Sequence, residues 1–259
     1  MLHYTIQGAG HPIVLVHGFP NDGSNWDTIT ASLSESYQLL IPDLPGAGKS
    51  PFVRDLTLAK MAKALIEVLD KEHIEQAIFA GHSMGGYTIM ELVTLFPERV
   101  KAISLVHSLA SADTEEKKEA RRKSIKLLQS SDIGKRTFVK AMAENLFSAS
   151  FKEAHPEAIE TIFNNGMQLS ADALAAFYHA IMIRSDKTEW LQQNKRIPIQ
   201  WIIGNEDNAT PMAEALSQCH LSAVNEVAIY KPCGHMSMME LPDRLAKDLR
   251  YFADYVYSF

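Results

Sequence analysis

The chain has little of several features that mark other classes of protein. Cysteine occurs only twice, at Cys219 and Cys233, which is too few for a disulfide framework, and the pair lacks the spacing of metal ligands. No apolar run approaches the length that spans a membrane, and the N-terminus lacks the basic and apolar segments of a signal peptide. We therefore expect a cytoplasmic protein without a membrane span, in which both cysteines are free thiols.

Basic residues are also in the minority. The chain has 25 Lys and Arg against 31 Asp and Glu, a formal net charge of -6, and no basic stripe dominates it. This balance argues against a nucleic-acid binder. Linkers rich in Pro, Gly or Ser, internal repeats and low-complexity tracts are absent as well. With 259 residues, the chain has the size of a single α/β domain that carries an insertion.

Short apolar runs alternate with segments of helical periodicity in both halves of the chain. Residues 2–7 are typical of an edge strand that turns back into a buried strand at 13–16. Further strands are expected at 38–41, 77–80, 102–106, 199–203 and 224–230, and helices at 26–33, 57–71, 84–96, 211–219 and from residue 242 onward. The pattern predicts a doubly wound α/β fold with a mostly parallel sheet, whose sites lie at the carboxyl ends of the strands.

The alternation is interrupted by a long segment without a convincing strand. Helical segments are expected there at 115–129, 138–147, 156–164 and 171–183. We predict a core formed by residues 1–110 and 187–259 and an inserted helical cap at 111–186. The first of these helices carries Arg121, Arg122 and Lys123, for which a solvated face is favoured over a docking patch for an acidic partner.

The stretch from Ala77 to Gly86 carries the strongest functional signal. A buried strand, a Gly-x-Ser-x-Gly turn at Gly81, Ser83 and Gly85, and a following helix form a nucleophile elbow, which lifts the serine hydroxyl clear of the sheet edge. The backbone N–H of Met84 then points to where negative charge develops on a reacting carbonyl oxygen. By itself the motif is modest, because an ordinary strand-to-helix turn also uses Gly and Ser.

A second glycine-rich string, which ends in Gly48, Lys49 and Ser50, invites comparison with a phosphate-binding loop. Such a loop needs a glycine five positions before the Gly-Lys pair, where this chain has Asp43, and Pro45 removes a backbone donor. We therefore expect a structural turn and no nucleotide.

A serine nucleophile needs a base and an acid, and both are expected at the same sheet edge. Asp207 follows the strand at 199–203 and His235 follows the last strand, so both can converge on Ser83. Glu206 is the competing acid. His17 and His82 are weaker candidates for the base. No metal-ligand motif is present, so neither a metal nor a cofactor is expected.

Taken together, the motifs resemble those of the α/β-hydrolase superfamily, in its capped group. They are His-Gly-Phe-Pro at 17–20, Asp-Leu-Pro-Gly-x-Gly-x-Ser at 43–50, Gly-His-Ser-Met-Gly-Gly at 81–86, Gly-x-x-Asp at 204–207 and Gly-His at 234–235. The resemblance implies Ser83 as nucleophile, His235 as base, Asp207 as acid, and the N–H groups of Phe19 and Met84 as the oxyanion hole. Relatives that attack with Asp carry it where this chain has Ser83, which excludes their chemistry. Relatives also have another strand before residue 2, so one edge strand is expected to be missing here.

The substrate is the open point, because one fold and triad serve many reactions. Hydrolysis of a small to medium carboxylic ester through an acyl-enzyme is the leading hypothesis. Cleavage of a carbon–carbon bond in a diketone is an alternative, and so is a slow-turnover small-molecule receptor of the same fold. The pocket is expected to be apolar, and its candidate lining residues are His107, Phe138, Met142, Phe177 and Met236.

Overall fold

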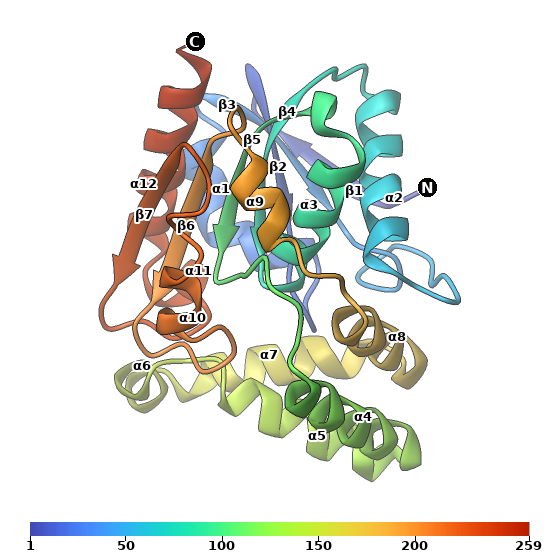
Figure 1. Ribbon diagram of the computed structural model, residues 1–259. Coiled ribbons are helices and arrows are strands. Elements are labelled where there is room, and N and C mark those ends of the chain that lie inside the picture. Colours follow the sequence, from blue (N-terminus) through green and yellow to red (C-terminus); the bar gives the residue numbers. More distant parts are fainter. Residues whose placement is uncertain (259) are drawn as a thin grey trace.

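A computed structural model describes residues 1–258 and contains one seven-stranded sheet (Figure 1). The strands lie in the order β1-β3-β2-β4-β5-β6-β7. Their bounds are Tyr4–Gln7 for β1, His11–Val16 for β2, Tyr37–Pro42 for β3, Ala77–His82 for β4, Val100–Val106 for β5, Ile199–Gly204 for β6 and Asn225–Tyr230 for β7. All are parallel to their neighbours except β1. This is the predicted doubly wound, mostly parallel sheet.

Strand β1 is the expected edge strand, but it does not pair with the strand that follows it in sequence. It runs antiparallel to β3, with Tyr4 opposite Pro42. Strand β1 cannot pair with β2, because β3 and β4 already pair with β2 in parallel on its two sides. The chain therefore passes over β3 before it enters the centre of the sheet.

Helices cover both faces of the sheet and enclose two apolar cores. One core packs α1 (Asp27–Leu33) and α12 (Pro242–Tyr257) on the sheet, and the other packs α2 (Leu58–Lys71) and α3 (Met84–Leu95) on the opposite face. Helix α2 begins where expected because the Thr57 side chain accepts a hydrogen bond from the Lys60 N–H. Shorter elements complete the core: η1 Gly23–Trp26, η2 Pro97–Arg99, α9 Thr188–Gln193, α10 Met212–Leu216 and α11 Ser237–Glu240.

The segment between β5 and α9 is helical, as predicted. It contains α4 (Glu115–Ser130), α5 (Asp132–Glu144), α6 (Ala149–Ala154), α7 (Pro156–Gln168) and α8 (Ala171–Met182). Figure 1 shows these five helices as a layer below the sheet, on the side where the strands end. Helix α5 begins earlier than residue 138 because Ser131 caps it by accepting from the Gly134 N–H. The six-residue α6 was not expected, since it is too short to show a helical period.

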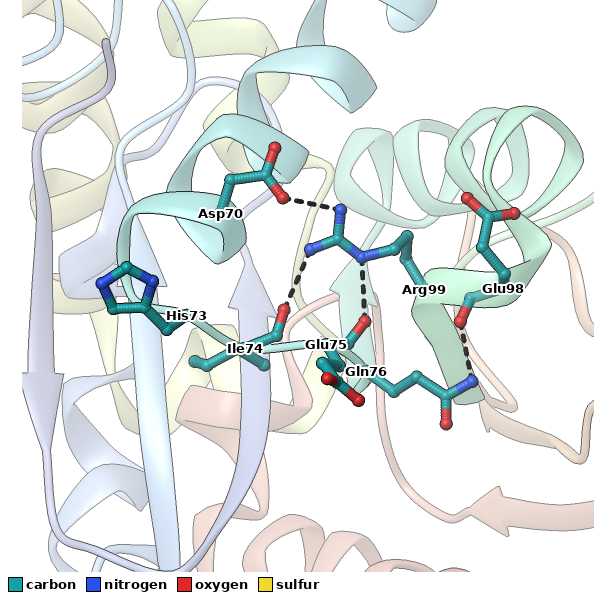
Figure 2. Close-up of a pocket in the computed structure, with 7 residues that line it drawn as sticks. All are labelled: Asp70, His73, Ile74, Glu75, Gln76, Glu98 and Arg99. Atoms are coloured by element: carbon teal, nitrogen blue, oxygen red, sulfur yellow. Dashed lines mark hydrogen bonds and ion pairs between the residues drawn. The ribbon is translucent and has the colours of Figure 1, made fainter.

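The opposite, amino end of the sheet carries a surface pocket of about 550 Å³ (Figure 2). Arg99 connects the residues that line this pocket. Its guanidinium donates hydrogen bonds to the carbonyl oxygens of Ile74 (2.9 Å) and Glu75 (2.8 Å), and it forms an ion pair with Asp70 at 2.7 Å. Asp70 is well exposed, so the ion pair contributes about 1 kcal/mol at most. The pocket lies beside the segment that joins α2 to β4. Ser83 follows the opposite end of β4, so the pocket is not part of its surroundings. None of the helices within residues 1–258 has the length and apolar character needed to cross a membrane.

Candidate active site

Ser83 occupies a strained turn between β4 and α3. Its φ of 51° and ψ of -115° lie outside the regions that non-glycine residues favour, at a cost of about 1–3 kcal/mol. Its carbonyl accepts a hydrogen bond from the Ser108 hydroxyl at 2.8 Å. Gly85 makes the turn possible, because a Cβ there would lie 2.2 Å from the Val16 carbonyl oxygen. Met84 is the first residue of α3, so its N–H lies at the positive end of the helix.

The loop after β2 approaches the elbow closely. A Cβ on Gly18 would lie 2.5 Å from Nδ1 of His82, so only glycine fits there. His17 holds the loop: its Nδ1 donates to the Gly18 carbonyl at 3.0 Å, and its Nε2 accepts from the Leu44 N–H at 2.9 Å. Phe19, the candidate oxyanion residue, follows directly and is buried.

Asp207 and His235 are paired at the carboxyl end of the sheet. His235 Nδ1 donates to Asp207 Oδ2 at 2.7 Å, and the Thr210 hydroxyl donates to the same oxygen at 2.7 Å. The other oxygen accepts the N–H groups of Ala209 and Thr210, each at 2.8 Å. Burial would raise the pKa of Asp207, but His235 and His107 outweigh it and hold the pKa well below its usual range. The carboxylate is therefore ionised and fixed in orientation.

His82 connects this pair to the elbow. Its Nε2 donates to the His235 carbonyl at 2.9 Å, and the two rings lie 4.9 Å apart. A carbonyl can only accept, so the proton is on Nε2, and Nδ1 accepts from the Asn25 amide at 3.4 Å. Since His82 directly precedes Ser83, this contact brings the backbone of the candidate base beside the candidate nucleophile.

His107 lies behind Asp207 and has almost no open surface. Its place after a strand beside Ser83 predicts a pocket-lining residue, but it is 1% exposed, and its Nδ1 donates to Asp207 Oδ2 at 3.1 Å. Burial lowers its pKa, although Asp207 opposes the shift. Its Nε2 has no hydrogen-bond partner within residues 1–258. Its φ of 50° turns the chain at the end of β5 as Ser83 does at the end of β4.

Glu206 faces away from the candidate base. Its Oε2 accepts from the Ala149 N–H at 3.0 Å, at the start of α6. This carboxylate therefore ties the inserted segment to the core, and of the two acids only Asp207 contacts His235.

Glu240 was not singled out from the sequence, yet it organises the loop that carries His235. Its carboxylate accepts the N–H groups of Gly234 (2.9 Å), Met236 (3.4 Å) and Ser148 (3.1 Å). The His235 N–H donates to the carbonyl of residue 146 at 2.6 Å. A glutamate five residues after Gly-His, next to a helix start, is the only sequence signal, and it is weak.

A cavity of about 520 Å³ lies between helices α4, α5 and α8 and the Asp207 loop. Phe138, Met142 and Tyr178 line it from one side, and Asn208 and Ala209 line it from the other.

Phe177 and Met236 were also expected to line the pocket. Their side chains are 1% and 0% exposed and belong to the two packed cores. Of the expected lining residues, the structure therefore brings Phe138 and Met142 to this cavity.

His107, Asp207 and His235 place ligand atoms within 4.8 Å of one another. Two imidazoles and a carboxylate are a donor set that zinc accepts. Here both Nδ1 atoms already face the same carboxylate oxygen, at 3.1 and 2.7 Å. The arrangement fits a hydrogen-bonded network that fixes proton positions.

The structure is an α/β fold in which a strained serine turn and a hydrogen-bonded Asp–His pair lie at the same edge of the sheet. Residues 11–242 match the family described as alpha/beta hydrolase fold. The chain belongs to this family.

Similar proteins include enzymes that act on esters. A thermophilic esterase from Thermogutta terrifontis superposes with a TM-score of 0.92 at 26% identity, covering 98% of this chain and 93% of that one. The enol-lactonase from Burkholderia xenovorans LB400 shares the fold, with a TM-score of 0.88 at 24% identity over 98% and 96% of the two chains. The acetyltransferase component of the acetoin cleaving system of Cupriavidus necator is 28% identical over 92% of this chain, which spans 63% of that protein's length.

Proposed function

We propose that this protein hydrolyses small to medium carboxylic esters, with Ser83 as nucleophile, His235 as base and Asp207 as the acid that orients the base. The observation that carries the proposal is the strained Ser83 beside the Asp207–His235 pair. Ser83 is partly exposed although the residues around it in β4 and α3 are buried. The likeness to an esterase over nearly the whole chain supports the same reaction.

In the first half-reaction, the Ser83 oxygen attacks the ester carbonyl carbon while His235 Nε2 takes the hydroxyl proton. The carbonyl electron pair moves onto oxygen, where the N–H groups of Phe19 and Met84 stabilise the negative charge. When the pair returns, the bond to the alkoxy oxygen breaks and His235 gives that oxygen the proton. The alcohol leaves, and the acyl group remains on Ser83.

Water completes the cycle by the same route. His235 takes a proton from water, whose oxygen attacks the acyl carbon, and the bond to Ser83 breaks as the serine oxygen recovers the proton. Asp207, held ionised, keeps the proton of His235 on Nδ1 throughout, so that Nε2 faces the reacting groups. The products are a carboxylic acid and an alcohol.

His107 has a positioning role in this proposal. It gives Asp207 Oδ2 a donor that does not take part in proton transfer, so the carboxylate keeps its orientation whichever protonation state His235 has. We further propose that residues 111–186 form a cap that encloses the substrate. The hydrogen bonds from the His235 and Ser148 N–H groups across the boundary hold this segment to the loop of the base.

Rapid mixing with p-nitrophenyl esters of graded acyl length tests the proposal. We expect a burst of p-nitrophenol of about one equivalent, or steady turnover if deacylation is fast, and a loss on the order of 10⁴–10⁶-fold in Ser83→Ala. Ser36→Ala, at an exposed turn, is the matched control and should behave as wild type. Normal hydrolysis by Ser83→Ala would reject the assignment. A burst without turnover would indicate a receptor, and faster cleavage of a diketone than of any ester would indicate a carbon–carbon hydrolase.

A further inference from the structure

A buried ion cluster lies where the inserted segment leaves and rejoins the core. Asp113 Oδ2 accepts from Arg121 Nε at 2.5 Å, and Asp113 Oδ1 lies 2.8 Å from Arg184 Nη1. The side chains of Asp113, Arg184 and Arg121 are 1%, 4% and 20% exposed. One carboxylate therefore serves two guanidinium groups in a largely water-free place.

Arg184 is a structural member of this cluster. Its Nε donates to the Ser111 carbonyl at 3.0 Å and its Nη1 to the Ile181 carbonyl at 3.0 Å, and the guanidinium lies 4.1 Å from the centre of the Tyr87 ring. These bonds join the two ends of the inserted segment. Asp186 follows on the same connection but is exposed and binds backbone N–H groups at Ala112 and Thr188.

Arg121 is different, and it departs from the expectation of a solvated face. It shares the inward side of α4 with Leu128, which is buried, whereas Arg122 is 47% exposed on the outer side. Arg121 donates one of its N–H groups to Asp113, and its guanidinium has several further N–H donors. The group lies 4.8 Å from the centre of the Tyr178 ring.

The three ion-paired groups carry one positive charge in excess, and the exposed Asp186 carboxylate adds a weaker electrostatic interaction with Arg184. Within residues 1–258, Asp113 is the only carboxylate in ion-pair contact with either guanidinium. Tyr87 and Tyr178 add no negative charge, because burial raises the pKa of both hydroxyls above its usual value. An uncompensated buried charge is costly, and removing Arg121 would leave a balanced Asp113–Arg184 pair. The buried ion pairs therefore leave one guanidinium without a buried carboxylate of its own, and an anionic ligand would supply the missing charge.

The cluster adjoins the candidate active site on two sides. The Tyr178 ring, which Arg121 covers, lines the cavity that reaches the Asp207 loop, and it lies 5.0 Å from the Phe19 ring. Tyr87, under Arg184, is one helical turn after Ser83, and its N–H donates to the Ser83 carbonyl at 3.1 Å. A ligand group held by Arg121 would therefore lie beside Tyr178, whose ring faces both the cavity and the candidate oxyanion residue Phe19.

We propose that Arg121 binds an ionised carboxylate of the substrate, so that the preferred esters are half-esters of short dicarboxylic acids. The inference rests on the proposed ester hydrolysis and names its substrate class. A single excess charge matches a monoanion, and the planar fork of a guanidinium matches a carboxylate. The ester end would lie at Ser83 and the free carboxylate at the far end of the acyl chain, against Arg121 and Tyr178.

Comparison of half-esters with the corresponding diesters tests this without any variant. Monomethyl succinate, glutarate and adipate carry the charge, and their dimethyl esters have the same acyl chain without it. For the best chain length we expect kcat/KM of the half-ester to exceed that of the diester by about 10-fold or more, since a charged hydrogen bond contributes about 1.5–3 kcal/mol. Equal values, or a preference for the diester, would overturn the inference and leave ester hydrolysis standing.

Variants then assign the preference to one residue. In Arg121→Met the ratio of kcat/KM for half-ester over diester should fall about 10- to 100-fold, with Arg121→Lys in between because it keeps the charge and loses the fork. Arg122→Met, on the outer side of the same helix, is the matched control and should keep the wild-type ratio. An unchanged ratio in Arg121→Met would overturn the inference. If wild type cleaves neither ester, the proposed function fails as well.

Discussion

Acid should destabilise this protein at an unusually high pH, because three histidines are buried in neutral form. His17, His82 and His107 are each at most 1% exposed, and burial is the largest cause that lowers the pKa of all three. In the unfolded chain their pKa returns to about 6.5. Below that pH the unfolded state binds more protons than the folded state, so stability falls as pH falls. The stabilisation is fully present above about pH 6.5 and is lost toward the folded-state pKa values.

The magnitude follows from the number of groups. Each histidine that is protonated only on unfolding contributes about 1.4 kcal/mol per pH unit. Three such groups set an upper limit of about 4 kcal/mol per pH unit for the slope below about pH 6. Domains have unfolding free energies of about 5–15 kcal/mol, so one to two pH units would remove much of the stability. Asp207 adds nothing in this window: its pKa is depressed, so its contribution holds above about pH 3.9 and is lost only in stronger acid.

Urea denaturation at pH 7.5, 6.0 and 5.0, followed by tryptophan fluorescence and circular dichroism, measures the slope. We expect the unfolding free energy to be nearly constant above pH 7 and to drop by several kcal/mol between pH 6 and pH 5. His220→Asn, at an exposed position, is a control that should leave the profile unchanged. A free energy that varied by less than about 1 kcal/mol across this range would refute the reasoning, since it would mean that these imidazoles protonate in the folded protein.

Three further predictions concern the site. Asp207→Asn should lower kcat by roughly 10³–10⁴-fold, because the tautomer of His235 is no longer fixed. Glu206→Gln should lower kcat by less than about 10-fold. If steady-state kinetics ranked the two variants the other way, Glu206 would be the acid. Glu240→Gln should lower the unfolding free energy by about 1–3 kcal/mol and reduce kcat, because the His235 loop loses its charged acceptor; a melting curve and rate equal to wild type would contradict this. Met142→Ala should shift the preferred acyl chain of p-nitrophenyl esters to greater length by enlarging the cavity, and an unchanged chain-length profile would remove this residue from the pocket.

The elbow could be predicted from sequence because its requirements are local. A positive φ at Ser83 and the close approach at Gly85 leave few residue types that fit, so the pattern Gly-x-Ser-x-Gly between a strand and a helix carries the geometry. The proximity of Asp207 and His235 could be predicted for a related reason. Each follows a parallel strand, and parallel strands present their carboxyl ends at one edge.

Residues whose surroundings depend on distant partners could not be predicted from the sequence. Arg121 has the same sequence context as Arg122, and only the position of Asp113 beneath α4 distinguishes the buried cation from the solvated one. The sequence places His107 at the end of a strand beside the elbow, which favours a pocket residue, but its hydrogen bond to Asp207 is a tertiary contact that the sequence does not reveal. Glu240 likewise acts through the loop that folds back onto it.

Peptide mapping after reaction with a fluorophosphonate tests the central claim most directly. If Ser83 is a nucleophile activated by His235, mass spectrometry should find one adduct per chain, on the peptide that contains Ser83. The adduct should be absent in Ser83→Ala and should form far more slowly in His235→Ala. An adduct on another residue, or a Ser83→Ala protein that still hydrolyses esters at the wild-type rate, would contradict the account.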